Sequence, residues 1–188
     1  MGREIEFEPQ RLDGVVLVKP VVWQDERGFF LETYHAEKYR SGGIPDPFVQ
    51  DNHSFSVRGT LRGLHGQLRH PQGKLVRAIL GEIFDVAVDA RPDSSTFGQW
   101  VGAVLSSDNH HQLYVPPGYV HGFVVMSETA HVQYKCTDLY YREDEIAVVW
   151  NDPDIAIDWP VAAPLLKERD ARAPRLAEIV HLLRSAGS

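Results

Sequence analysis

The sequence predicts an all-β fold, a β-sandwich with short peripheral helices. Short runs rich in Val, Ile, Phe, Tyr and Trp are separated along the whole chain by Pro and Gly, which is typical of strands joined by turns. Helices of about 10–15 residues do not alternate with these runs, which disfavours a TIM barrel or a doubly wound sheet. The 188 residues fit one domain, with a core expected over about 14–160 and a C-terminal extension over 161–188.

Eight segments have the composition and the bounding turns of strands. They are 14–23, 28–35, 74–90, 99–106, 111–117, 121–127, 130–140 and 146–150. The longest is interpreted as a hairpin that turns at Gly81. Its second strand alternates apolar residues with Asp85, Ala87 and Asp89, so these three residues share one face.

Helical periodicity is clear only near the C-terminus. In RLAEIVHLLR, residues 175–184, apolar side chains recur with helical spacing at Leu176, Ile179, Val180 and Leu183. A second, short helix is expected over 36–43, closed by a glycine.

Charge and cysteine content exclude several classes of protein. The formal net charge of −7 argues against bulk binding to nucleic acid or to a membrane surface, and leaves room for a local positive pocket that takes a small anion. Cys136 is the single cysteine, so a disulfide within the chain and a cysteine-based zinc site are excluded, and a cytoplasmic location is expected. The opening MGREIEFEPQ lacks the apolar core of a secretory signal, and no apolar run approaches the roughly 20 residues of a membrane helix.

Common nucleotide-binding and hydrolase motifs are absent. Neither G-x-G-x-x-G nor G-x-x-x-x-G-K-[ST] occurs, so ATP chemistry and Rossmann-type redox chemistry have no support. The nucleophile elbow G-x-S-x-G is missing as well.

Three residues are candidates for proton chemistry. His65 lies in the strand-like stretch RGTLRGLHGQ, residues 58–67, between two glycines and close to arginines. Tyr134 shares a strand face with Val132, so it is expected to point inward, where a tyrosine is most often a core ring with a satisfied hydroxyl. Lys74 opens an apolar strand, where a lysine gains little from packing. Taken singly, His65 and Tyr134 are better explained as structural residues.

A metal site is an alternative interpretation. The stretch PPGYVHG, residues 116–122, resembles the second half-motif of cupin metal sites, but the first half-motif H-x-H is replaced by His65-Gly66-Gln67. The candidate ligands are then His65, Gln67 and His121, and an amide is a weak ligand. A metal-dependent cupin oxygenase therefore stays open as a minority interpretation.

Cationic residues from separate segments suggest an anion-binding cleft. Arg27 in ERGFF and Arg62 in LRGLH lie beside glycines and apolar strands, where a guanidinium group is able to meet a phosphate. Most of the other arginines are expected to be solvated surface groups.

Five separated blocks of the sequence resemble one family in order and spacing. They are FVQDNHSFSVRGTLRGLH, PQGKLVRAILGEIFDVAVDARPDSSTFGQWVG, VPPGYVHGF, QYKCTDLYYREDE and WNDPDIAIDWP, and they look like the dTDP-4-dehydrorhamnose 3,5-epimerases. The resemblance implies a cupin-type jelly roll, a homodimer, no metal and no redox cofactor. It also implies a dTDP-linked 4-keto-6-deoxy sugar as the ligand.

The resemblance also implies roles for individual residues. His65 would be the base, Asp170 in KERD would orient its imidazole, Tyr134 would be the acid, and Lys74 would contact the keto oxygen. Positions that line the nucleotide-sugar site would be Arg27, Glu32, Gln50, Asn52, Arg62, His121, Glu145 and Lys167.

The implied reaction converts dTDP-4-dehydro-6-deoxy-D-glucose to dTDP-4-dehydro-L-rhamnose, as in rhamnose biosynthesis. A ketone at C4 acidifies the hydrogens at C3 and C5, so one carbonyl serves both inversions without oxidation.

Gly66 departs from the family, which usually has an aromatic residue after the base histidine. That departure keeps open a sister enzyme that inverts only C3 or only C5. A sugar-nucleotide-binding protein without catalysis is a further alternative, although a base, an acid and an oxyanion partner together argue against it.

Overall fold

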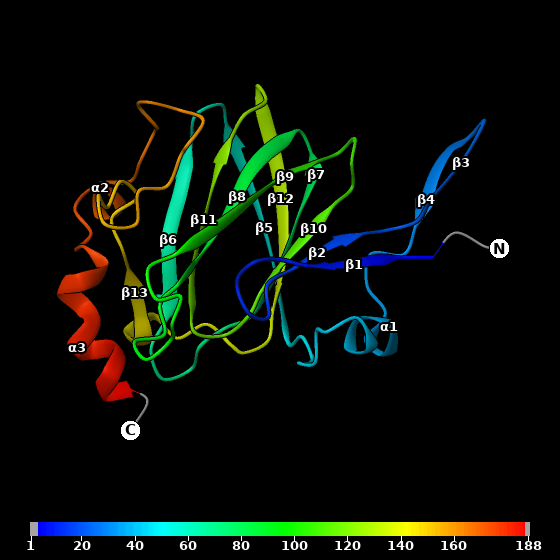
Figure 1. Ribbon diagram of the computed structural model, residues 1–188. Coiled ribbons are helices and arrows are strands. Elements are labelled where there is room, and N and C mark those ends of the chain that lie inside the picture. Colours follow the sequence, from blue (N-terminus) through cyan, green and yellow to red (C-terminus); the bar gives the residue numbers. More distant parts are fainter. Residues whose placement is uncertain (1–3, 187–188) are drawn as a thin grey trace.

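Strands with alternating apolar residues build two sheets that pack face to face, together with a small two-stranded sheet (Figure 1). The computed structural model describes residues 4–186. The first three residues of the opening stretch and the last two of the expected C-terminal extension lie outside them. All strand pairs between the named strands are antiparallel, so the predicted all-β sandwich is confirmed.

The larger sheet has six strands. In spatial order they are β1 (Glu6–Pro9), β2 (Val16–Lys19), β10 (Gln112–Val115), β7 (Lys74–Leu80), β12 (Thr129–Cys136) and β5 (Gln50–Val57). The second sheet has five, in the order β13 (Glu145–Ala147), β6 (Leu61–Gln67), β11 (Tyr119–Val125), β8 (Glu82–Asp89) and β9 (Trp100–Ser106). Sequence neighbours often lie in opposite sheets, so the chain crosses repeatedly between the layers, as in a jelly roll.

A two-stranded arm projects from the sandwich. It consists of β3 (Val22–Asp25) and β4 (Gly28–Leu31), which pair only with each other and extend away from both sheets (Figure 1). The expected bend at Pro20 falls between β2 and β3. Trp23, Phe29 and Phe30 are more than half exposed on this arm.

The helices are short and peripheral. They are α1 (Ala36–Ser41), α2 (Glu168–Ala171), α3 (Leu176–Ala186) and a 3₁₀ turn over Arg142–Asp144. The expected helices near the two ends are confirmed as α1 and α3. Within the described part of the chain, no helix has the length and apolar character that crossing a bilayer requires.

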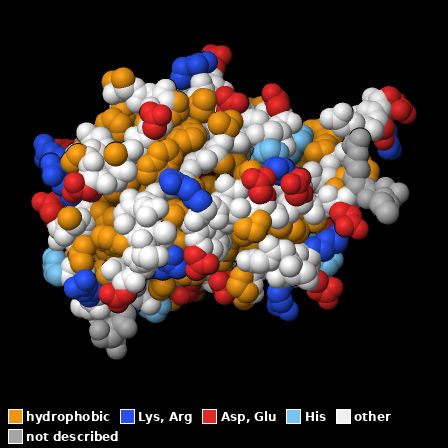
Figure 2. Space-filling view, viewed as in Figure 1, with side chains coloured by type: hydrophobic (Ala, Val, Ile, Leu, Met, Phe, Trp, Pro, Cys, Tyr) orange, Lys and Arg blue, Asp and Glu red, His pale blue; other side chains and the backbone are white. Residues whose placement is uncertain are grey.

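Alternation along the strands separates two apolar layers. Ala87 and Val132 belong to the cluster between the two sheets. Val86 and Val88 belong to a second cluster, on the other face of the five-stranded sheet, which α3 covers with Leu176. Figure 2 shows acidic and basic side chains interspersed on one surface of the molecule, with apolar atoms between them.

The expected hairpin over 74–90 is wrong. Its two halves are the strands β7 and β8, which lie in different sheets: β7 pairs with β10 and β12, and β8 pairs with β11 and β9. Gly81 turns the chain from one sheet to the other at a positive φ of 78°. Alternation locates a strand, but it does not identify the strand that pairs with it.

Two further strands and one helix had no sequence signal that we used. β1 and β5 are short or polar edge strands, each with one partner. α2 is a four-residue helix, too short for a periodic pattern.

A close backbone contact fixes β6 against β11. Gly63 has φ +131°, and a Cβ atom there would lie 2.5 Å from the Cα of Gly122 and 2.8 Å from the carbonyl oxygen of His121. Only glycine therefore fits at this position without moving the neighbouring strand.

The substitution Gly63→Ala is expected to lower the free energy of unfolding by about 2–3 kcal/mol, because it combines a strained φ with a backbone clash. Gly59→Ala is the matched control, since Gly59 also has positive φ but a Cβ there meets nothing within 4 Å. Urea unfolding of both variants measures the difference, and equal losses would contradict the steric argument.

Candidate active site

A cavity of about 400 Å³ opens between the two sheets, and both sheets contribute to its walls. This volume lies in the range of small-molecule sites, about 300–1,000 Å³. His65 and His121 come from the five-stranded sheet, and Lys74 and Tyr134 come from the six-stranded sheet. Two imidazoles therefore lie on one wall of the cavity, and an ammonium and a phenol lie on the opposite wall.

Strand register explains why these side chains meet. His65 on β6 is the direct partner of His121 on β11, so the two imidazoles lie side by side. Lys74 on β7 is the partner of Cys136 on β12, two residues beyond Tyr134. Because side chains two residues apart share a face, Lys74 and Tyr134 both point into the gap between the sheets.

Asp170 on α2 anchors His65. Nε2 of His65 and Oδ1 of Asp170 are 2.8 Å apart, and the carboxylate is almost fully buried. Burial raises the pKa of Asp170, but the hydrogen bond and charge of His65 and the backbone N–H of Gly63 outweigh it and bring that pKa below its ordinary value. A carboxylate that accepts the Nε2 proton fixes the ring tautomer. Nδ1 of His65 has no hydrogen-bond partner within residues 4–186.

Lys74 is buried and Tyr134 is partly buried. Burial lowers the pKa of Lys74, against the opposing effect of Cys136, Glu145 and Asp85. Burial raises the pKa of Tyr134, so its phenol keeps its proton at neutral pH.

A second histidine–carboxylate pair lies beside the first. Nε2 of His121 and Oδ1 of Asp85 are 2.8 Å apart, and Asp85 is fully buried on β8. Burial raises the pKa of Asp85, and His121 and Lys74 act against that rise. The sequence interpretation did not include Asp85 in the site. A carboxylate inside a strand that has apolar residues on both faces was a usable signal of a buried charge.

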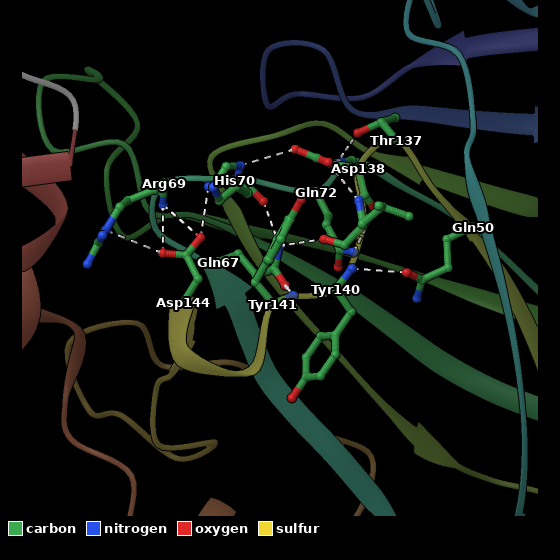
Figure 3. A network of polar contacts seen from close by, with 12 residues as sticks. Gln50, Gln67, Arg69, His70, Gln72, Thr137, Asp138, Tyr140, Tyr141 and Asp144 are labelled. Carbon is green, nitrogen blue, oxygen red and sulfur yellow. Dashed lines mark hydrogen bonds and ion pairs between the residues drawn. The ribbon is translucent and has the colours of Figure 1, made fainter.

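A polar network holds the segment that closes one side of the cavity (Figure 3). Gln67 donates to the carbonyl oxygens of His70 and Leu139 and accepts from the backbone N–H of Tyr141. The buried carboxylate of Asp144 accepts from the backbone N–H groups of Arg69 and His70. These bonds fix the chain on both sides of Tyr140.

Tyr140 is a cavity residue that the sequence interpretation missed. Its ring lies at the edge of the cavity, and its hydroxyl donates to Glu145. Gln50 accepts from the backbone N–H of Tyr140 (Figure 3). Half-exposed aromatic residues between strands give no periodic signal, which is why Tyr140 escaped notice.

The metal-site interpretation loses one of its three ligands. Both ends of the Gln67 amide are engaged by the main chain, as described above, so neither is free for a metal ion. Nε2 of His121 is committed to Asp85. Across residues 4–186, no group of three or more His, Cys, Asp and Glu side chains is arranged to hold a metal ion.

The structure brings four of the eight expected substrate positions to this cavity. Arg62, His121, Glu145 and Lys167 line it. Gln50 and Asn52 lie on the neighbouring edge strand β5 and hydrogen-bond to each other, without lining the cavity.

Arg27 and Glu32 lie elsewhere in this chain. Arg27 is at the tip of the arm, paired with Asp25, and Glu32 follows β4 and pairs with Lys38. The physical reason is the projection of the arm, which carries both residues away from the sandwich.

Gly66 faces the apolar layer and not the histidines. A Cβ atom there would lie 3.2 Å from Cγ1 of Val120 and 3.4 Å from Cγ1 of Ile146, both members of the cluster on the outer face of the five-stranded sheet. The missing aromatic ring therefore changes the packing behind β6.

The chain is similar to known proteins over most of its length. A family model described as dTDP-4-dehydrorhamnose 3,5-epimerase matches residues 9–178. The dTDP-4-dehydrorhamnose 3,5-epimerase of Pseudomonas aeruginosa is 55% identical over 166 residues, which are 87% of this chain and 92% of that protein. The enzyme of the same name from Methanothermobacter thermautotrophicus is 51% identical over 158 residues, 84% of this chain and 85% of that protein.

Solved structures show the same fold. The crystal structure of dTDP-6-deoxy-D-glucose-3,5-epimerase from Legionella pneumophila, in complex with dTDP-4-keto-L-rhamnose, superposes with a TM-score of 0.92. The two sequences are 47% identical, and the match covers 95% of this chain and 97% of that chain.

Proposed function

The chain belongs to the dTDP-4-dehydrorhamnose 3,5-epimerase family, and we propose that it inverts C3 and C5 of a dTDP-linked 4-keto-6-deoxy sugar between its two sheets. As a member of this family it is an isomerase that acts on carbohydrates. The substrate is dTDP-4-dehydro-6-deoxy-D-glucose and the product dTDP-4-dehydro-L-rhamnose. One observation carries the proposal: His65 and Tyr134 line the same cavity from opposite sheets.

His65 is the base in this proposal. Its imidazole removes the hydrogen at C3 or C5, and the electron pair of that C–H bond moves onto the C4 oxygen as an enolate. Asp170 favours the imidazolium ion that forms, because its carboxylate is 2.8 Å from Nε2.

Lys74 and Tyr134 complete the chemistry from the opposite wall. The Lys74 ammonium stabilises the enolate oxygen, a contact that is worth about 3–4 kcal/mol by comparison with oxyanion-hole donors. Tyr134 donates its phenolic proton to the opposite face of the carbon, which inverts the centre. The phenolate then regains a proton from solvent and the imidazolium loses one, so each inversion is balanced without a redox step.

The substitution His65→Asn is expected to lower kcat by about 10²–10⁴-fold, because it removes the general base. Turnover of dTDP-4-dehydro-6-deoxy-D-glucose in D2O, followed by NMR, checks this directly. The active enzyme places deuterium at both C3 and C5. His53→Asn is the control, since His53 is exposed on β5 and bonds to His131 outside the cavity. Label at one centre only would support a single-site epimerase instead.

The substitution Tyr134→Phe separates proton removal from inversion. His65 still abstracts a proton and exchanges it with solvent, but no acid remains on the opposite face. We expect deuterium in recovered substrate without inversion, together with a loss of product formation. Inverted product at the wild-type rate would remove Tyr134 from the acid role.

We also propose that the enzyme is a homodimer in which the arm of one copy reaches the cavity of the other. The hairpin forms no strand pair with any other described segment, and its three exposed aromatic side chains favour burial against a partner. This arrangement also gives Arg27 a place at the site that its own chain does not offer.

Subunit complementation tests the exchanged arm. His65→Asn and Arg27→Ala homodimers are each expected to be weakly active, whereas co-expressed chains form mixed dimers in which one of two sites is intact. A random mixture then recovers about a quarter of wild-type activity. Light scattering checks the dimer, and mixed dimers without recovered activity would contradict the exchange.

A further inference from the structure

Asp85 is a buried carboxylate that the proposed reaction does not yet use. It is 0% exposed on β8, and Oδ1 accepts a hydrogen bond from Nε2 of His121 at 2.8 Å. Oδ2 is also buried and has no hydrogen-bond partner within residues 4–186. A buried carboxylate oxygen without a partner is costly unless a positive charge compensates it.

Lys74 supplies the nearby positive charge from the facing sheet. Asp85 shares its strand face with Ala87, and Lys74 shares its face with Val76, and both apolar residues belong to the cluster between the sheets. The two charged groups therefore point into the same gap. The two groups do not form a direct ion pair. Burial lowers the pKa of Lys74 and raises the pKa of Asp85, and the charge of each group opposes the shift of the other.

Other carboxylates around the cavity are already committed. The titratable and charged groups around the cavity that holds Lys74 are Arg62 and His65 on β6, Asp85 on β8, His121 on β11, Tyr134 and Cys136 on β12, Tyr140 before β13, Glu145 on β13, and Lys167 and Asp170 at α2. Glu145 pairs with Arg169 and accepts from Tyr140, and Asp170 pairs with His65. Among the carboxylates named here, Asp85 is the one with a buried oxygen that has no hydrogen-bond partner in residues 4–186, so its negative charge is available to act on Lys74 across the gap.

We propose that Asp85 is a positioning residue that keeps the Lys74 ammonium charged inside the cavity, so that Lys74 is able to stabilise the enolate. Asp85 acts through Lys74 and does not touch the sugar. The inference rests on the proposed function, because it requires Lys74 to work as a cation at the C4 oxygen.

The substitution Asp85→Asn tests this role with little change of shape. The introduced amide oxygen still accepts from Nε2 of His121, so the anchor of His121 is preserved while the negative charge is lost. Without that charge the pKa of Lys74 falls. The alkaline limb of the kcat/KM profile is therefore expected to move to lower pH by about one unit, while the rate on the plateau changes much less.

Asp89→Asn is the matched control. Asp89 lies on the same face of β8, is equally buried, and pairs with Arg91, Ser94 and Thr96 outside the cavity. Its replacement is expected to lower stability and leave the alkaline limb in place. An unchanged limb in Asp85→Asn, with only a lower melting temperature, would overturn the proposal.

NMR of [13Cε]lysine gives a readout that does not depend on turnover. The chain has five lysines, and Lys74→Met assigns the resonance of Lys74. In the wild-type protein the resonance is expected to be that of an ammonium at pH 7.5, and its titration is expected to move down in Asp85→Asn. Should that variant fail to fold, a neutral Lys74 in the wild-type protein at pH 7.5 would still refute the proposal.

The Lys74→Met variant also distinguishes the proposed role of Lys74 from the proposed role of Asp85. Unchanged kcat in Lys74→Met would remove the proposed role of Lys74 itself. A loss of kcat in Lys74→Met, with no shift of the Lys74 titration in Asp85→Asn, would remove only the role of Asp85.

Discussion

The gap between the two sheets is the constraint on which the site depends. Stacked sheets lie about 10 Å apart, and along most of the sandwich apolar side chains such as Val76 and Val132 fill that space. At the cavity the inward positions are instead His65, Lys74 and Tyr134. A sugar ring bound in this gap would have one sheet facing each side of the ring. Chemistry that needs a base and an acid on opposite faces of a carbon then follows from the architecture.

Buried charge is the cost of that arrangement, and pairing offsets it. Asp170 and Asp85 are both almost fully buried, and each carboxylate accepts a hydrogen bond from the Nε2 atom of a histidine. Breaking such a pair leaves one charge uncompensated, which costs about 3–5 kcal/mol. The two pairs lie side by side because their histidines are direct partners on β6 and β11. Secondary structure thus places the two histidine–carboxylate pairs next to each other.

The sequence predicted the strands better than their partners. Alternation located β8 and helical periodicity located the C-terminal helix, yet β7 and β8 were assigned to one hairpin. Alternation along a strand does not identify its partners, which contacts between separate segments decide. The contact of His65 with Asp170 spans 105 positions, so it came from resemblance to a family and not from spacing. Tyr140 was missed, since a single aromatic residue between strands carries no periodic signal. Alternation did assign Asp85 to a strand face, but it gave no partner for the carboxylate. Arg27 lies at the tip of the arm and does not line the cavity of its own chain, so only the family resemblance pointed to it.

The position of Asp170 shows how a four-residue helix holds a carboxylate accurately. Before α2, Leu165 donates its N–H to the carbonyl oxygen of Gly59 and accepts from the N–H of Leu61, which ties the chain to the start of β6. After α2, the N–H of Leu176 donates to the buried carboxylate of Asp152, and the side chain of Leu176 packs into the outer apolar cluster. The carboxylate is therefore fixed from both ends to the layer that supports β6. Because β6 carries His65, the imidazole of His65 and the carboxylate of Asp170 are held by the same support.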